Sequence, residues 1–251
     1  MEKGICNYTV LALRATPSDK SEMVSQLLYG DSYQIIEEET NYFRIRTDFD
    51  AYEGWLDKKQ HVALTDSRQV SEVFFVSEAV CVHKTPEGLS KIFSFGSIIS
   101  AREKLQMSDI KTMKFSTNFD GDKMVEHAKK LLGVPYLWGG KSAFGIDCSG
   151  LVQLCAKATG KRLFRDASMQ ATQGEMIDFL QEAQAGDLAF FENKEGAIVH
   201  VGIVMSNQEI IHASGMVRID LLDQSGIYNR AMKRHTHKLR FIKRISEIER
   251  I

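Results

Sequence analysis

Hydrophobic and polar positions alternate over short runs in the first part of the chain. Residues 34–37 and 42–47 form two such runs, and the polar stretch 38–41 between them is typical of a β-hairpin turn. Another short strand is expected to begin at Gly54. Short strands at this close spacing favour a small β-barrel, which we place at residues 1–60.

Residues 61–118 have a similar but less regular pattern. A turn is expected at 86–88, where proline and glycine flank a glutamate. The pattern predicts a second small barrel in this region. The candidate strands are residues 73–76, 79–83, 91–95 and 98–101.

From residue 119 onward the pattern changes to helices followed by strands. Apolar residues at helical spacing over 124–132 predict a first helix that stops at Gly133 and Pro135. A second helix follows, and residues 119–251 are therefore expected to form an α+β domain. Its strands are expected at residues 187–191, 200–205 and 209–213.

Cys148 lies at the expected start of the second helix, which should run to about residue 159. Asp147 is a suitable N-cap and Gly160 a suitable terminator. The unpaired N–H groups and partial positive charge at a helix start stabilise a thiolate and can contribute to an oxyanion hole. The alternative is that Cys148 is only a small buried hydrophobe, as we expect for Cys155 in the middle of the same apolar helix.

His200 and His212 are expected on neighbouring antiparallel strands. A short turn at Ser206-Asn207-Gln208 makes the residue numbers of paired positions sum to about 412, which places His200 opposite His212 on one face. One ring can then act as a base while the other orients it, as in a Cys-His-polar triad with Cys148. The alternative for His200 is a core histidine bonded to a backbone carbonyl.

A metal site is the main rival for the same three residues, because Cys148, His200 and His212 are possible zinc ligands. A metal site usually brings a further carboxylate or histidine, and a cysteine at a helix start suits a nucleophile better. We therefore expect no metal and no cofactor. The other histidines are assigned no role: His61, His83, His127, His235 and His237.

Composition and charge narrow the possible partners. The formal net charge is -1, with 43% hydrophobic and 26% charged residues, so nucleic acid and anionic membranes are not expected partners. Four cysteines at irregular spacing indicate free thiols in a reducing compartment. The first 14 residues lack the order of a secretory signal, and we expect a cytoplasmic protein, although a trimmed precursor would look the same.

Several motifs together resemble one family. Residues 147–152 (Asp-Cys-Ser-Gly-Leu-Val) resemble the nucleophile motif of the NlpC-type cell-wall peptidases, and residues 186–191 resemble the strand that precedes their base. The stretches that start at His200 and His212 resemble the base and the third polar residue, and Arg165 with Ser168 and Gln170 resembles a segment between them. The resemblance covers about residues 120–245. It implies a papain-like fold with Cys148, His200 and His212 as catalytic residues.

The N-terminal part is similar to the bacterial SH3-like barrels of one subgroup of that family, through residues 21–30 and 50–55. Members of this subgroup are γ-D-glutamyl-L-diamino acid endopeptidases, which release L-Ala-γ-D-Glu from muropeptides with a free N-terminal L-Ala. The resemblance implies that Glu22, Tyr52 and Asp147 bind the substrate ammonium. It also implies that Tyr136, Ser149 and Arg165 line the site near the D-Glu.

Plainer interpretations remain for the ammonium-binding residues. Tyr52 is explained equally by packing in the barrel, Glu22 by a solvated surface, and Asp147 by capping alone.

The first hypothesis is therefore a cysteine endopeptidase that acts on peptidoglycan-derived peptides in cell-wall recycling. A wall-binding protein with an idle catalytic domain and an acyl or peptidyl transferase on the same fold are the alternatives. The intact set of Cys148, His200 and His212 disfavours the idle domain. The sequence indicates neither the preferred diamino acid nor the oligomeric state.

Overall fold

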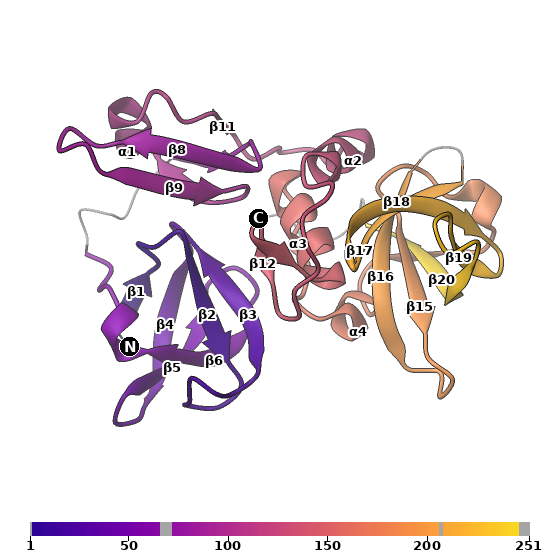
Figure 1. Ribbon diagram of the computed structural model, residues 1–251, viewed down its shortest axis with the longest axis horizontal. Helices are drawn as coiled ribbons and strands as arrows, with labels where there is room; N and C mark the ends of the chain where they lie inside the picture. The colour runs from indigo at the N-terminus through magenta and orange to yellow at the C-terminus, as the bar shows by residue number, and fades with distance from the viewer. Residues whose placement is uncertain (1, 66–71, 206–207, 246–251) are drawn as a thin grey trace. The chain divides into compact units, whose positions relative to one another are not determined.

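The computed structural model describes residues 2–65, 72–205 and 208–245. The chain divides into two compact units, each described by itself below (Figure 1). Unit 1 is Met1–Phe115 with Trp138–Gly145, and unit 2 is Ser116–Leu137 with Ile146–Ile251. No helix among the described residues is both long and apolar enough to cross a membrane.

Unit 1 begins with a six-stranded antiparallel sheet in the order β1-β4-β5-β6-β2-β3. Alternate residues of its strands point into a core that includes Leu13, Leu27 and Tyr33, so the sheet curls into the barrel that the alternation predicts. The expected hairpin is present, with β4 and β5 paired on either side of residues 39–41. The elements are β1 (Lys3–Ile5), β2 (Val10–Arg14), β3 (Met23–Leu28), β4 (Ser32–Glu38), β5 (Tyr42–Thr47), β6 (Glu53–Asp57) and the 3-10 turn η1 (Lys58–Gln60).

The second part of unit 1 holds a three-stranded sheet, β10-β7-β11, and a separate hairpin, β8-β9. The four expected strands are confirmed to within one residue at each end. A short helix was not expected; its start is fixed by a capping box between Ser100 and Glu103. The assignment of 61–118 as a second barrel, and the domain boundaries at 60 and 118, stay predictions. The elements are β7 (Val73–Val76), β8 (Val80–Lys84), β9 (Ser90–Ser94), β10 (Ile98–Ser100), α1 (Ala101–Gln106), β11 (Thr112–Met113) and, from the later segment, the pair β12 (Lys141–Ser142) and β13 (Gly145–Ile146).

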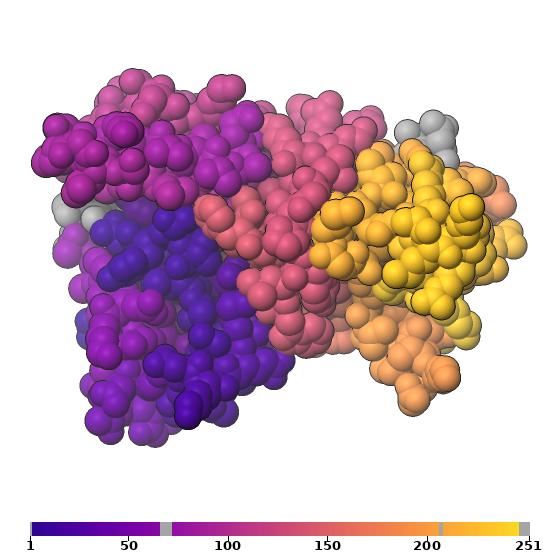
Figure 2. Space-filling view, in the orientation of Figure 1, coloured from indigo at the N-terminus to yellow at the C-terminus, as the bar shows by residue number. Residues whose placement is uncertain are grey.

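Unit 2 combines helices with a seven-stranded sheet in the order β14-β20-β15-β16-β17-β18-β19. Because β19 also pairs with β20, the six strands from β20 to β19 close into a ring. Figure 2 shows one face of these strands, in orange and yellow. The elements are α2 (Gly121–Lys129), α3 (Cys148–Ala158), α4 (Ala167–Gln170), β14 (Glu175–Ile177), the 3-10 turn η3 (Leu180–Glu182), β15 (Leu188–Glu192), β16 (Ile198–Met205), β17 (Glu209–Ser214), β18 (Met216–Asp223), β19 (Gly226–Asn229) and β20 (Arg234–Arg244).

Helix α3 confirms the prediction made from its apolar sequence. The Asp147 carboxylate accepts the N–H of Gly150 as an N-cap, and Gly160 ends the helix in a left-handed conformation with φ of 78°. Every residue of α3 is buried, and the helix packs against β16 and β17. The first residue of the helix is thereby held against the strands that carry the two histidines.

Candidate active site

Cys148 is the first residue of α3, and its side chain is almost completely buried. Its thiol lies beside the backbone of Ser149 and of Val201, whose hydrogen bonds favour the thiolate. Val201 directly follows His200 on β16, so the structure brings the cysteine and the strand of the candidate base together. The catalytic pairing of Cys148 with His200 stays a prediction that this proximity supports.

Burial nevertheless raises the pKa of the Cys148 thiol to about 11, and the charge of Asp147 adds to the increase. Burial also lowers the pKa of His200 well below its usual value, and the charges of His237 and His212 act in the same direction. The hydrogen bond from the helix start lowers the pKa of Cys148 as expected, but the opposing effect of desolvation is larger. Cys148 and His200 are therefore both neutral at neutral pH.

His200 and His212 contact each other directly. Nε2 of His200 lies 2.9 Å from Nδ1 of His212, although the strand register differs from the expected one. The paired residues of β16 and β17 have numbers that sum to 414, as in Ile203 with Ile211, so the expected sum of 412 is wrong and each partner lies two residues further along. Of the expected turn, Ser206 and Asn207 lie outside the described residues. A shift by two keeps both histidines on the same face, which is why the neighbourhood survives.

Gly202 explains how the two rings meet. In this register the next pair after Ile203 and Ile211 is Gly202 with His212, and a Cβ on Gly202 would lie 3.0 Å from Cβ of His212. It would also lie 2.6 Å from the Ile210 side chain, closer than real Cβ atoms approach. The absence of a side chain at 202 therefore leaves the room in which the His212 ring reaches diagonally to His200.

Asp220 on β18 extends this series of hydrogen bonds and was missed by the sequence analysis. Its Oδ2 lies 3.2 Å from Nε2 of His212, and both side chains are fully buried. Arg218 donates to both carboxylate oxygens, and the backbone N–H of Arg230 donates to Oδ1. Burial alone would raise the pKa of Asp220, but the hydrogen bonds from His212, Arg218 and Arg230 bring it down to about 2. Asp220 is therefore a buried carboxylate.

His237 on β20 is the second residue that the sequence analysis missed. Its ring stacks on His200, with centroids 4.2 Å apart and planes inclined by 25°. Burial, followed by the charge of His212, lowers the pKa of His237 to about 4. The neutral ring covers one face of the candidate base.

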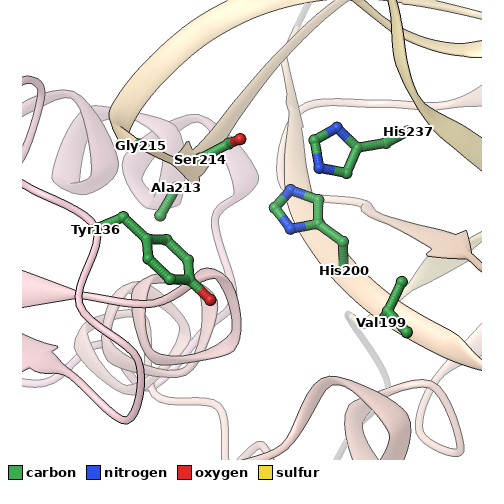
Figure 3. A pocket seen from close by; sticks show the side chains of 7 residues that line it. All are labelled: Tyr136, Val199, His200, Ala213, Ser214, Gly215 and His237. Carbon is green, nitrogen blue, oxygen red and sulfur yellow. The ribbon is translucent and has the colours of Figure 1, made fainter.

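A small pocket opens beside these rings, with a volume of about 300 Å³. His200 and His237 face it from one side, and Tyr136 lies across from them (Figure 3). None of the described residues that line it is acidic. The remaining lining residues are Val199, Ala213, Ser214 and Gly215.

Asp147, Ser149 and Arg165 form a buried polar cluster next to Cys148. The Arg165 guanidinium donates to both oxygens of Asp147, at 3.0 and 2.6 Å, and to Oγ of Ser149 at 2.9 Å. Asp147 is thus more than a helix cap, because its charge is balanced by Arg165 inside unit 2. Burial raises the pKa of Tyr136 to about 12, and the charges of Cys148 and Asp147 contribute, which places the phenol beside this cluster.

Glu22 and Tyr52 belong to unit 1. Glu22 is exposed and accepts a hydrogen bond from the indole N–H of Trp138. Tyr52 is partly buried, and its backbone N–H donates to Oγ1 of Thr47. Their role in substrate binding stays a prediction.

The arrangement suits a cysteine nucleophile with a histidine base, and these roles stay predictions. Among residues 2–65, 72–205 and 208–245, no three or more histidine, cysteine or acidic side chains are arranged to hold a metal ion. His200 and His212 instead use ring nitrogens to bond each other. A signal for Asp220 did exist, since an Arg-x-Asp pair interrupts an apolar strand, whereas His237 sits in a basic run that carries no such signal.

Comparison with known proteins identifies two regions. Residues 133–240 match the model of the NlpC/P60 family, and residues 13–60 match the bacterial dipeptidyl-peptidase SH3 domain. The chain is 28% identical over 212 residues to a protein of Bacillus subtilis named gamma-D-glutamyl-L-lysine dipeptidyl-peptidase, covering 75% of this chain and 71% of the relative. It is also 28% identical over 250 residues to dipeptidyl-peptidase 6 of Lysinibacillus sphaericus, covering 84% and 89%.

A solved structure shows the same fold. The crystal structure of an NlpC/P60 family protein from Bacillus cereus matches 97% of this chain and 99% of its own, with a TM-score of 0.81 at 18% identity. The papain-like fold preceded by an SH3 domain, expected from the sequence, is therefore confirmed.

Proposed function

The chain is a cysteine peptidase of the NlpC/P60 family that carries a bacterial dipeptidyl-peptidase SH3 domain, and on this premise we propose that it hydrolyses the bond between γ-D-Glu and the diamino acid of peptidoglycan-derived peptides. The preferred peptides begin with a free L-Ala. One observation carries the proposal: a buried cysteine at a helix start lies against the strand of a histidine that is bonded to a second histidine. The name of the Bacillus subtilis relative supports the γ-D-glutamyl specificity.

The proposed reaction begins with the neutral pair of Cys148 and His200. As the sulfur attacks the γ-glutamyl carbonyl, the thiol proton passes to His200, so no resting thiolate is required. His200 then gives this proton to the nitrogen of the diamino acid, and the C–N bond breaks to leave a thioester. Water attacks the thioester with His200 again acting as base, which regenerates the thiol and releases L-Ala-γ-D-Glu.

The helix start has two further tasks in this proposal. Backbone N–H groups at the start of α3 stabilise the oxyanion that forms on the glutamyl carbonyl. The buried guanidinium of Arg165 holds Asp147 and Ser149 in place through its hydrogen bonds to both side chains. With Tyr136, these side chains give the D-Glu part of the substrate a polar surface.

For the ammonium of the free L-Ala we propose Asp147, Glu22 and Tyr52, as the resemblance implies. A buried ammonium requires a counter-charge, and a single Asp147 already balanced by Arg165 provides too little. A second carboxylate is therefore needed, and Glu22 is its candidate. Glu22→Gln and Tyr52→Phe should raise KM for a free tripeptide more than they lower kcat.

Mass spectrometry of muropeptide digests tests the activity. The wild type is expected to release L-Ala-γ-D-Glu, and Cys148→Ala is expected to release none while keeping the same circular dichroism spectrum. An added amine distinguishes hydrolysis from transfer, because a transferase yields an amide of the dipeptide. Turnover by Cys148→Ala contradicts the proposal.

Peptides with a free L-Ala are products of wall turnover and not parts of an intact wall, so we place the reaction in recycling in the cytoplasm. Fractionation of cells with an antibody against the protein tests this location. Recovery of the protein from the wall or medium contradicts it.

A further inference from the structure

Three buried side chains form an unbroken hydrogen-bonded line that leads away from the candidate base. Nε2 of His200 lies 2.9 Å from Nδ1 of His212, and Nε2 of His212 lies 3.2 Å from Oδ2 of Asp220. The exposed fractions of the three residues are 6%, 0% and 0%. We propose that Asp220 is a positioning residue that fixes which ring nitrogens of His212 and His200 carry protons, and so keeps His200 ready to accept the thiol proton. This inference rests on the proposed function only for the identity of the substrate.

The donors and acceptors along this line determine where the protons lie. A carboxylate accepts hydrogen bonds and cannot donate, so the bond to Asp220 requires a proton on Nε2 of His212. A neutral imidazole carries a single N–H, which leaves Nδ1 of His212 as an acceptor. His200 must therefore donate from its own Nε2. The lone pair of His200 is then at Nδ1, the one ring position that can receive a proton from Cys148.

The environment of Asp220 keeps it in the ionised form that this argument needs. Its Oδ2 is shared between His212 and Nε of Arg218, at 2.7 Å from the latter. Its Oδ1 accepts from the guanidinium of Arg218 and from the backbone N–H of Arg230, at 3.1 Å each. A fully buried carboxylate is costly unless it is paired in this way. On β18, Asp220 shares a face with Arg218 and Leu222, and its side chain is fully buried.

A purely structural role is the competing interpretation. Arg218 also donates to Oδ1 of Asn229, so Asp220 and Arg218 together help to hold β18 against the end of β19. The two roles differ in what they change. If Asp220 only holds β18 in place, its loss lowers the stability of the fold. If it fixes the ring protons, its loss changes the histidine tautomers and kcat in a protein that still folds.

The test compares Asp220→Asn with Arg218→Gln. An amide of the same size can turn its NH2 toward His212 and donate, which reverses the line and puts the His200 proton on Nδ1. Asp220→Asn is therefore expected to lower kcat by about 100-fold or more, with KM within about threefold, as for loss of a carboxylate that orients a catalytic histidine. Arg218→Gln keeps the carboxylate against His212 and is expected to lower kcat by less than about tenfold. It is expected to lower the midpoint of thermal unfolding at least as much as Asp220→Asn does.

The tautomers are read directly by 15N NMR of the imidazole nitrogens in the full chain. The wild type is expected to show Nε2–H on both His200 and His212, assigned with His200→Gln and His212→Gln. A proton on Nδ1 of wild-type His212 overturns the proposal even if Asp220→Asn does not fold. A folded Asp220→Asn protein with unchanged tautomers and kcat within threefold overturns it as well. These NMR outcomes do not depend on which peptide is cleaved, so failure of the proposed substrate is separable from failure of this inference.

Discussion

The rings of His237 and His200 are stacked, with centroids 4.2 Å apart and planes 25° from parallel. His237 comes from β20 and His200 from β16, two strands that both pair with β15 and so lie on either side of it. The stack shields one face of the base from solvent and limits the rotation of its ring. It also puts a second titratable group against the base, whose charge lowers the pKa of His200 after the larger effect of burial.

Replacing His237 separates shielding from charge. His237→Phe keeps a flat ring in the stack and removes the charge, so kcat should stay within about threefold while the acid limb of kcat/KM moves to higher pH, because the pKa of His200 rises. His237→Ala removes the shield and should lower kcat by about tenfold. The measurement is a pH profile of kcat/KM for the two variants and the wild type. An acid limb that stays in place in His237→Phe contradicts the electrostatic part of this account.

The thiol chemistry gives a second prediction. Because burial raises the pKa of Cys148 to about 11, its alkylation by iodoacetamide should accelerate steadily from pH 7 to pH 10. A thiolate paired with an imidazolium would instead react at a constant rate down to mildly acidic pH. Cys81 is the more exposed cysteine, so the rates are best measured in Cys81→Ser, with the same protein carrying Cys148→Ala as the blank. A rate that is flat between pH 5 and pH 8 argues against the neutral pair.

The position of Cys148 at the start of a buried helix was predicted correctly because the signals for it are local. A cap, an apolar helix and a terminating glycine lie within 14 residues of one another around Cys148. The proximity of His200 and His212 was also predicted. The register was wrong by two residues, but a shift of two residues keeps both side chains on the same face. The effect of burial on the thiol was missed, because desolvation depends on everything that packs around α3.

The contacts that Asp220 and His237 make were beyond the reach of the same reasoning. Asp220 meets His212 through the pairing of β17 with β18, and His237 meets His200 only because β20 returns to pair with β15. Local pattern shows that such strands exist but not which strand lies beside which. Glu22 and Tyr52 were named from resemblance, and the experiments on their variants have still to test them.

A stability prediction concerns the buried pair of Arg165 and Asp147. Arg165→Met removes the partner of a buried carboxylate and should lower the free energy of unfolding by about 3 kcal/mol, as for other broken buried pairs. The double variant Arg165→Met, Asp147→Asn removes the unpaired charge and should recover part of that loss, although the cap to Gly150 weakens. Urea unfolding followed by fluorescence measures both. A loss below 1 kcal/mol in the single variant means that the pair does not hold the start of α3.

The pH dependence of stability follows from His127. Burial lowers its pKa to about 4, with Lys130 and Lys123 adding to the shift, so the folded state favours the neutral ring. The stabilisation is present above the unfolded pKa of about 6.5 and is lost as the pH falls toward 4. Between pH 7 and pH 4.5 the unfolded state takes up a proton on His127 more readily than the folded state does. The free energy of unfolding should therefore fall by about 1 to 2 kcal/mol, after allowance for solvent screening. His127→Gln should show a correspondingly smaller loss in urea unfolding at the two pH values, and an equal loss in both proteins contradicts the assignment.

The central claim is a peptidase that requires a free N-terminal L-Ala, and one pair of substrates tests it most directly. The assay compares L-Ala-γ-D-Glu-diamino acid tripeptide with its N-acetylated form at equal concentration, using Cys148→Ala as the blank. A blocked nitrogen carries no charge for a carboxylate to bind, and the added group needs space. The account predicts rapid release of L-Ala-γ-D-Glu from the free peptide and negligible cleavage of the acetylated one. Equal rates on the two peptides would contradict it and would indicate a peptidase that does not read the N-terminus.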